Sequence, residues 1–339
     1  MRTLKFVWVD DQPKKIEDYR KVIEVGVEYL ELTASIEAME VRDELLTTMD
    51  SWSSRNQGRP PDLFIIDHVF NTALPFRLNG SSVAHLLRNT FPRVPIVCVT
   101  AKYDDSSSFD QEDLSEYTAL FLYKQLELHV EDLYVIARDF RKLSPVDADV
   151  RAHLIRSLKP PRRDREDLLR VLPEEFQDQK HVTTQHHMGR WICTVLLRRP
   201  GFLYDRLRIA TLLGLTEAGF NKVEPLFAKA LYRGVFATHR SPIWWVSEVY
   251  RLLFNAIDNS RVSVPQIAGR ALPGISPSDF STCYVSKTTD PPPDAVVMTD
   301  ATSGAVRRVV RREFAKQHPR DLGVAPGFET RLVLAKRPR

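Results

Sequence analysis

Four short apolar runs, separated by segments with helical periodicity, constrain the fold of the first 143 residues more than any other feature. The runs are Leu4–Val9, Asp62–Ile66, Pro95–Val99 and Ala119–Tyr123, and a weaker strand is expected around Glu31–Ala34. Nearly continuous apolar runs of this length are typical of strands that are covered on both faces. Alternation of such strands with helices implies right-handed crossovers and a parallel sheet. The sequence therefore predicts an α/β fold with a doubly wound, five-stranded parallel sheet.

The segments between these runs are predicted helices. Their expected positions are a start near Pro13, then Ile36–Met49, Ser81–Asn89, Glu112–Tyr117 and Leu128–Lys142. Proline is favourable in the first turn of a helix because its missing N–H would have no partner there. The first domain is accordingly predicted to span residues 1–143.

A polar residue follows each apolar run, at the point where the strand would end. These residues are Asp10 with Asp11, then Asp67, Thr100 and Lys124. The carboxyl ends of parallel strands line one crevice, and ligands bind there. Mg²⁺ prefers carboxylates together with water and phosphate oxygens, and an ammonium group neutralises charge on a transferring phosphoryl group. Any one of these residues could instead be an ordinary turn or capping residue, but five in this order favour a shared site.

The order and placement of these residues resemble the receiver domain of two-component response regulators. The resemblance implies a flavodoxin-like sheet and a phosphoryl group accepted on Asp67 from a histidine kinase or phosphotransfer protein. It also implies that Thr100 hydrogen-bonds the attached phosphoryl group and that Lys124 pairs with its oxygens. Phe121, three residues before Lys124, is the expected aromatic switch that turns inward on activation.

The same resemblance implies a Mg²⁺ site. Its expected ligands are Asp10, Asp11, Asp67 and the backbone carbonyl of Val69. Without a metal, three carboxylates this close would repel one another, and the pKa of at least one should rise.

Three features depart from the family pattern. The loop His68–Asn79 is long, Gln125 follows the lysine where the family usually has a proline, and Asp104–Asp113 is acidic and rich in serine. These departures concern loop geometry and kinase-contact surfaces, and they remove none of the charged residues.

Charge divides the chain unevenly. Residues 1–150 carry a net charge of −9 and the remaining 189 residues carry +13, which gives the overall +4. A basic second half is typical of a domain that binds a polyanion such as duplex DNA. Electrostatic attraction between the two halves, in an autoinhibited chain, is the alternative explanation, and both can hold.

The second half is predicted to be mainly helical. We expect a linker over 144–165, a helical domain over 166–259, an extended Pro- and Ser-rich segment over 260–300, and a basic C-terminal helix and tail over 301–339. The expected helices are Glu166–Val171, His186–Leu197, Tyr204–Leu213, Glu217–Leu231, Trp244–Ile257 and Ser303–Gln317.

One stretch is similar to many winged-helix DNA-binding domains. Arg206–Leu213 would be the first helix, Gly214–Thr216 the turn, Glu217–Leu231 the recognition helix and Gly234–Phe236 the entry to the wing. Simple core packing of two helices is the alternative reading. Pro225 lies inside the expected recognition helix and should shorten or kink it.

Candidate nucleic-acid contacts are basic and amide side chains in two places. On the recognition helix they are Asn221, Lys222 and Lys229. On the expected C-terminal helix they are Arg307, Arg308, Arg311 and Arg312, set around an apolar face of Val306, Val309, Val310 and Phe314. A solvated face or a protein-binding surface is the alternative for this helix.

Other classes of protein are disfavoured. No apolar run approaches the length of about 18 residues that a membrane span needs, and no signal peptide is expected. Cys98, Cys193 and Cys283 are far apart, which fits a reducing cytoplasm better than a disulfide framework. No Walker A loop, nucleophile elbow, Rossmann glycine fingerprint or HExxH motif is present. Beyond a receiver that promotes its own phosphorylation and dephosphorylation, we therefore expect no enzyme.

The sequence thus predicts a cytoplasmic, Mg²⁺-dependent response regulator whose phosphorylation on Asp67 alters a basic output domain. Sequence-specific DNA binding is the first hypothesis for the output, and homodimerisation on activation is compatible with it. The second hypothesis is an adaptor that binds a protein partner without nucleic acid, and an effector enzyme of unfamiliar type is a third. Salt dependence separates the first two, because electrostatic DNA binding weakens steeply as salt rises.

Overall fold

The chain folds into two compact units that are not contiguous in sequence. The first unit comprises residues 1–157 and 173–195, and the second comprises 158–172 and 196–339. The computed structural model describes residues 3–40, 47, 51, 52, 54, 60–70, 79–101, 114–144, 149–176, 182–257, 262–299, 306–318 and 327–335. The first crossing, after residue 157, lies within the predicted linker over 144–165, but the division is not a single one, because 173–195 returns to the first unit.

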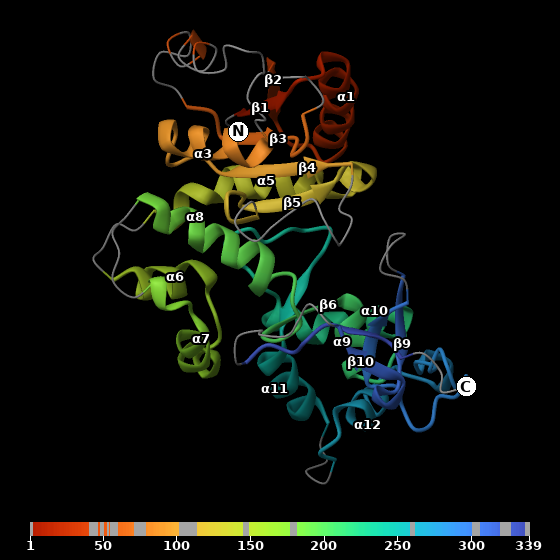
Figure 1. The fold of residues 1–339 in the computed structure, drawn as a ribbon. Helices are drawn as coiled ribbons and strands as arrows, with labels where there is room; N and C mark the ends of the chain where they lie inside the picture. Colours follow the sequence, from red (N-terminus) through yellow and green to blue (C-terminus); the bar gives the residue numbers. More distant parts are fainter. Residues whose placement is uncertain are drawn as a thin grey trace. The chain divides into compact units, whose positions relative to one another are not determined.

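A five-stranded parallel sheet forms the centre of the first unit (Figure 1). Its strands are β1 (Leu4–Asp10), β2 (Ala34–Glu40), β3 (Leu63–Ile66), β4 (Ile96–Thr100) and β5 (Ala119–Leu122). They lie in the order β2-β1-β3-β4-β5, and every pairing is parallel. This is the flavodoxin-like order of doubly wound sheets. The predicted fold class is confirmed.

Helices cover both faces of this sheet. They are α1 (Pro13–Tyr29), α3 (Gly80–Thr90), α5 (Val130–Asp139) and the flanking 3₁₀ segments η1 (Tyr123–His129) and η2 (Phe140–Leu143). Successive side chains of a strand point to opposite faces, and β1 follows this rule. Val7 and Val9 pack with Val83 of α3, whereas Trp8 stacks on Tyr19 of α1 with ring centroids 5.6 Å apart. The middle strands are therefore fully buried, as the apolar runs predicted.

The second strand differs from its prediction. The sequence placed it at Glu31–Ala34 with a helix from Ile36, but β2 extends to Glu40 and pairs with β1 along its length. The strand lies at the edge of the sheet, where only Ile36 and Met39 are buried, so its pattern lacks a continuous apolar run. The rest of the predicted helix, apart from Thr47, lies outside the described residues, as do residues 71–78 and 102–113.

Two further helices belong to the first unit. They are α6 (Val150–Leu158) and α8 (Val182–Trp191), which continues as a π-helix, η5 (Ile192–Leu196). The side chain of Gln185 donates to the carbonyl of Phe140 at 2.7 Å, and Nε2 of His186 donates to the carbonyl of Pro92 at 3.0 Å. Pro92 precedes β4, so α8 packs near the amino end of that strand, opposite the end where Thr100 lies.

A helix-turn-helix with a two-stranded sheet lies in the second unit. Its elements are β6 (Leu203–Asp205), α9 (Arg206–Leu212), α10 (Glu217–Val223), η6 (Glu224–Ala230), β7 (Ile243–Trp245) and α11 (Val246–Ala256). Gly214 makes the turn with a φ of +68°, which glycine adopts without steric cost. Thr216 then caps α10 by accepting a hydrogen bond from Gly219 N at 3.0 Å. The α-helix ends before Pro225, which confirms the predicted shortening.

The remainder of the second unit corrects two expectations. Its elements are η3 (Arg162–Asp164), α7 (Arg165–Val171), α12 (Pro265–Arg270), η7 (Pro277–Asp279), β8 (Ala295–Met298), β9 (Arg307–Val310), η8 (Arg312–Phe314), β10 (Ala315–Gln317) and β11 (Leu332–Leu334). Residues 260–300 are thus not simply extended. The predicted helix Ser303–Gln317 is wrong, because the described part forms strands of a sheet with the order β10-β11-β8-β9. The valines of this segment are β-branched and favour strand over helix. No helix within the described ranges has the length and apolar character needed to cross a membrane.

Candidate functional site

A cluster of buried acids, which we name the acidic pocket, lies at the carboxyl end of the parallel sheet. Asp10 ends β1 and Asp67 follows β3, and these strands pair with Val9 opposite Ile66. Asp10, Asp11 and Asp67 are all buried, with at most 7% of their surface exposed. Thr100 ends β4, the neighbour of β3, and is 2% exposed. The strand order therefore gathers the predicted carboxylates at one end of the sheet.

Lys15, in the first turn of α1, provides the positive charge of this pocket. Its Nζ forms an ion pair with Oδ2 of Asp67 and lies 3.7 Å from Oδ2 of Asp10. Only 20% of the Lys15 side chain is exposed. The ammonium group thus lies between two carboxylates that come from adjacent strands. The sequence analysis did not single out this residue.

Aromatic rings line the pocket beside Lys15. Lys15 Nζ lies 4.4 Å from the ring centre of Tyr123, and Tyr123 stacks on Tyr19 with centroids 4.2 Å apart. The Tyr123 hydroxyl lies 3.4 Å from Oδ2 of Asp10. A cation over an aromatic face is attracted to the ring, so the stack holds the ammonium group next to the acids.

Burial alters the protonation of Asp10. Desolvation raises the pKa of this carboxyl to about 6. The charge of Lys15 acts in the opposite direction, and the negative charge of Asp67 raises the pKa again. Removing a carboxylate from water disfavours its charged form, whereas a nearby cation favours it. The pKa is raised as expected, but burial is its main cause, and repulsion by Asp67 is a smaller contribution.

The arrangement does not fit a resident metal ion. Among the residues that the structure describes, no group of three or more His, Cys, Asp and Glu side chains is placed to hold one. Asp10 and Asp67 have the oxygen ligands that Mg²⁺ prefers, but they share the Lys15 ammonium. The Mg²⁺ site expected from the sequence is therefore not formed in this arrangement.

The other predicted receiver residues lie in three different environments. Lys124 is exposed on η1, and Tyr123 takes the buried position that faces Asp10. Phe121 is already buried, with its ring 4.9 Å from that of His129. Val69 donates its N–H to Oδ1 of Asp67 at 3.4 Å. The roles of Lys124, Phe121 and the Val69 carbonyl stay predictions.

Two of the three contacts predicted for the helix-turn-helix are already used within the second unit. Lys222 pairs with Asp279 of η7, with Nζ 2.7 Å from Oδ1, and Asn221 accepts a hydrogen bond from Arg206. A Cβ at Gly219 would lie 2.9 Å from the backbone oxygen of Asp279. Segment η7 therefore lies directly on this part of α10.

The four C-terminal arginines have separate environments. Arg307 pairs with Asp205 at 2.6 Å, and Arg308 lies over the ring of Tyr284 at 5.0 Å. Arg311 pairs with Glu313 at 2.9 Å. The backbone N–H of Arg312 donates to Asp294 at 2.7 Å. They do not form the single basic helical face that the sequence predicted.

A second group of cations surrounds a pocket of about 570 Å³ in the second unit. We call it the basic pocket and define it by Lys159, Arg162, Lys229 and Arg233. All four side chains are exposed, and none of them forms an ion pair or side-chain hydrogen bond with another described residue. Glu248, the acid that lines this pocket, accepts hydrogen bonds from Arg251. The pocket therefore has a net positive charge.

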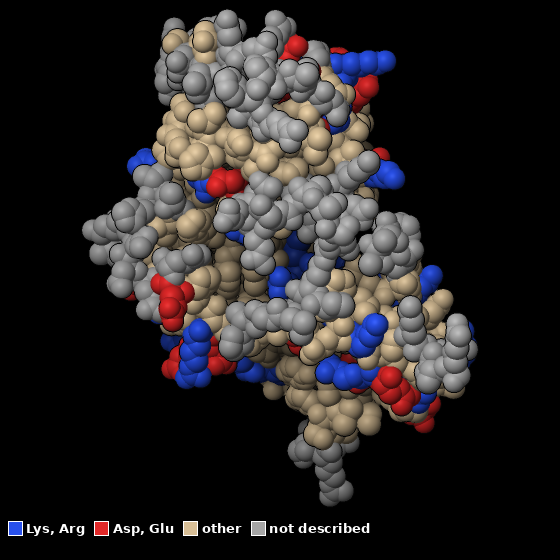
Figure 2. Space-filling model, in the orientation of Figure 1, with Lys and Arg blue, Asp and Glu red and all other residues tan. Residues whose placement is uncertain are grey.

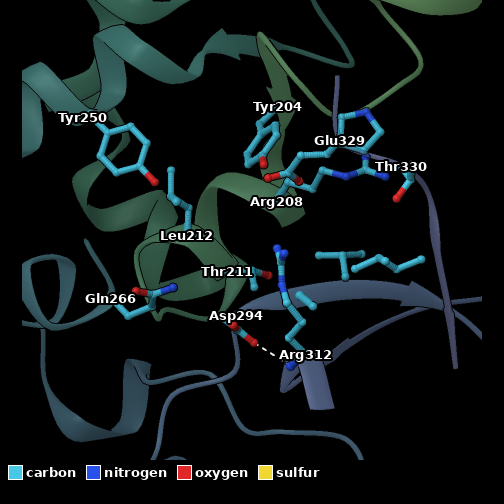
Figure 3. Close-up of a pocket in the computed structure, with 14 residues that line it drawn as sticks. Tyr204, Arg208, Thr211, Leu212, Tyr250, Gln266, Asp294, Arg312, Glu329 and Thr330 are labelled. Carbon is cyan, nitrogen blue, oxygen red and sulfur yellow. Dashed lines mark hydrogen bonds between the residues drawn. The ribbon is translucent and has the colours of Figure 1, made fainter. Parts of the chain in front are cut away.

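Another pocket of the second unit, with a volume of about 180 Å³, is lined by both basic and acidic side chains (Figure 3). The side chain of Arg312 extends into it, and Tyr204, Arg208 and Glu329 lie together on the opposite side. Burial and Glu329 raise the pKa of Tyr204. On the face shown in Figure 2, Lys and Arg are likewise interspersed with Asp and Glu. The basic pocket differs from these surfaces in its excess of one charge.

The first unit is similar to response-regulator receiver domains. The receiver domain of RcsB from Salmonella enterica serovar Typhimurium matches 40% of this chain and 90% of its own, with 12% identity and a TM-score of 0.28. A CheY-like receiver from Methanospirillum hungatei matches 40% of this chain and 98% of its own, with 18% identity and a TM-score of 0.26. The Mn²⁺-bound form of the response regulator Rcp1 matches 38% of this chain and 88% of its own, with 13% identity and a TM-score of 0.27.

The flavodoxin-like topology of the first unit follows from its strand order. No protein-family model matches the sequence. No curated protein matches it either.

Proposed function

We propose that the first unit is a receiver domain that accepts a phosphoryl group on Asp67. The observation that supports this proposal is the buried carboxylate of Asp67 at the carboxyl end of the parallel sheet. One of its oxygens forms an ion pair with the Lys15 ammonium group. In sheets of this topology, ligands bind outside the carboxyl ends of the strands. A histidine kinase, a phosphotransfer protein or a small phosphodonor would supply the phosphoryl group.

The reaction is a displacement at phosphorus. A carboxylate oxygen of Asp67 attacks the phosphorus atom, and the bond between phosphorus and the donor's nitrogen or oxygen breaks as the donor leaves with the electron pair. Catalysis of such a step depends mainly on positioning and on neutralising the equatorial oxygens. Lys15 is already in place to provide one positive charge, whereas the exposed Lys124 would have to turn toward the pocket.

The acceptor is tested with acetyl phosphate on the full chain, with and without Mg²⁺. The wild type should incorporate one acid-labile phosphoryl group, seen by intact mass, and Asp67→Asn should incorporate none. Asp18→Asn, which changes an exposed acid on α1, is the matched control and should behave as the wild type. Incorporation by Asp67→Asn would show that another residue is the acceptor.

For the output we propose that the second unit binds the phosphates of duplex DNA. Support comes from its net positive charge, from the helix-turn-helix of α9 and α10, and from the four cations of the basic pocket. Lys229 and Arg233 lie on the same unit as the turn and its sheet, beyond the end of α10. Cations without an internal partner gain most from a phosphate, because they lose no existing ion pair.

Binding of random duplex DNA to the full chain, followed by fluorescence anisotropy over a salt series, tests this output. Lys229→Gln and Arg233→Gln should each weaken binding and lower the salt slope by about one counterion. Arg165→Gln removes an exposed cation three residues from Arg162 and should change neither quantity. Absence of binding by the wild type at low salt would exclude DNA as the partner.

One observation favours the alternative of a protein-binding adaptor. Lys222, Asn221 and Arg307 are all engaged within the second unit, so the surfaces that commonly read bases are partly covered. In that case the receiver would control a protein partner, and pairing of two copies through β5 and α5 is a further arrangement that this proposal includes. We propose no catalytic output domain.

A further inference from the structure

The Lys15 ammonium lies where two carboxylates of the acidic pocket converge. Its Nζ contacts Asp67 and is 3.7 Å from Asp10. Both of these acids were expected as ligands of a divalent cation. A metal bound to both carboxylates would have its oxygen ligands at about 2.0–2.1 Å, so it would lie close to the Lys15 ammonium and be repelled by its charge.

We propose that Lys15 is the resident counter-ion of the acidic pocket and competes with divalent cations for Asp10 and Asp67. The inference rests on the proposed function, because the proposed phosphoryl transfer is the reason to test Mg²⁺ and Mn²⁺ as the competing cations. Its test measures binding rather than phosphoryl transfer, so either proposal can fail while the other holds.

Two features of the site hold Lys15 in the pocket. Its ammonium group lies over the Tyr123 ring, which is itself packed against Tyr19. Its side chain is only 20% exposed, so its interaction with the acids is screened less than that of a surface pair. A divalent cation that binds Asp10 and Asp67 would have to displace the Lys15 ammonium group from these acids. The ammonium group would then keep its positive charge beside the Tyr123 ring.

The adjacent Lys14 provides a matched control. Lys14 is exposed on the same turn of α1 and makes no ion pair or side-chain hydrogen bond with the described residues. Lys15→Met removes the competing charge and keeps the length of the side chain. Lys14→Met removes the same charge from solvent.

Calorimetric titration of the full chain with MgCl₂ and MnCl₂ measures the competition. Removal of a unit charge a few ångströms from the bound cation should raise the affinity of Lys15→Met by about ten-fold or more over the wild type. Lys14→Met should match the wild type. Equal affinities for the wild type and Lys15→Met, or no binding by either, would overturn the proposal.

A second measurement needs no variant. Acetylation of the native chain, mapped by fragment-ion mass spectrometry, should modify Lys14 much faster than Lys15, because the Lys15 amine is held between two carboxylates. The protection of Lys15 should persist at millimolar Mg²⁺. Equal reactivity of the two lysines, with or without Mg²⁺, would show that Lys15 is not resident in the pocket.

Discussion

Nζ of Lys222 lies 2.7 Å from Oδ1 of Asp279, 57 residues later in the chain. The lysine that the sequence assigned to a DNA groove is therefore neutralised within its own unit. The acid also accepts hydrogen bonds from the backbone and hydroxyl of Ser276, each at 2.9 Å. The ion pair therefore connects α10 to segment η7.

We expect Lys222→Gln to weaken duplex DNA binding less than Lys229→Gln does. Lys222 must give up an existing ion pair to contact a phosphate, whereas Lys229 has no such partner among the described residues. Anisotropy titrations of the two variants at one low salt concentration make the comparison. A larger loss for Lys222→Gln would indicate that η7 leaves α10 when DNA binds.

Lys15 and Lys124 should differ in their effect on phosphoryl transfer. In metal-free buffer, Lys15→Met should slow incorporation from acetyl phosphate by roughly ten-fold or more, and Lys124→Met by less than about two-fold. The physical reason is that the Lys15 ammonium is in contact with Asp67, whereas Lys124 is exposed. Initial rates by intact mass provide the measurement. The reverse order would place the neutralising charge on Lys124, as the family resemblance implied.

His186 should make the first unit sensitive to acid. Burial, followed by the charge of Arg88, lowers the pKa of His186 to about 4. Its Nε2 donates to Pro92, and its Nδ1 is buried without a hydrogen-bond partner among the described residues. A proton on Nδ1 would therefore have no acceptor.

The unfolded chain binds this proton at a higher pH than the folded chain does. Stability should consequently fall as pH drops from about 6.5 to about 4, by up to about 3 kcal/mol in total. Urea unfolding followed by circular dichroism at several pH values measures the slope. His186→Gln should lose this slope, and His187→Gln, at the neighbouring position, should keep it. An unchanged slope in His186→Gln would assign the acid sensitivity to other groups.

Gly80 should tolerate no side chain. A Cβ there would lie 2.2 Å from the backbone oxygen of Asp67 and 2.7 Å from Cα of His68. Backbone atoms cannot move aside as a flexible side chain can, so Gly80→Ala should lower the free energy of unfolding by about 1–3 kcal/mol. It should also displace Asp67, the proposed phosphoryl acceptor. At Gly26 the atoms nearest to an added methyl group belong to the side chain of Val130, so Gly26→Ala should cost less. Urea unfolding and phosphoryl incorporation of both variants provide the test, and equal losses would contradict this explanation.

The central strands could be predicted because burial on both faces leaves a continuous apolar run. The predicted Ala119–Tyr123 and observed β5, Ala119–Leu122, show this agreement. The edge strand β2 has the sequence ASIEAME and buries only two of its seven residues, so its composition of Ala, Glu and Met favoured a helix. The helix predicted for the C-terminal segment was wrong for a different reason. Its valines occur at helical spacing, but pairing of β9 with β8 determines their conformation.

The acids of the candidate site could be predicted from their positions at strand ends, but Lys15 was not identified. A cation one turn into the helix that follows Asp10 and Asp11 is at the correct end of the sheet, and that spacing was the available signal. Whether such a lysine points toward the acids depends on Tyr19 and Tyr123, which are 104 positions apart. The partner of Lys222 likewise comes from a distant segment, η7, that no local pattern indicates.

The chain crosses between its two units three times, after residues 157, 172 and 195. No single cut can release either unit whole: division near 157 leaves the first without α8, and division near 195 leaves the second without α7. Partial proteolysis should therefore yield fragments that stay associated until denatured. Joining either unit to a domain of another protein would therefore require at least two new chain connections. A regulator whose domains are joined by a single linker requires only one.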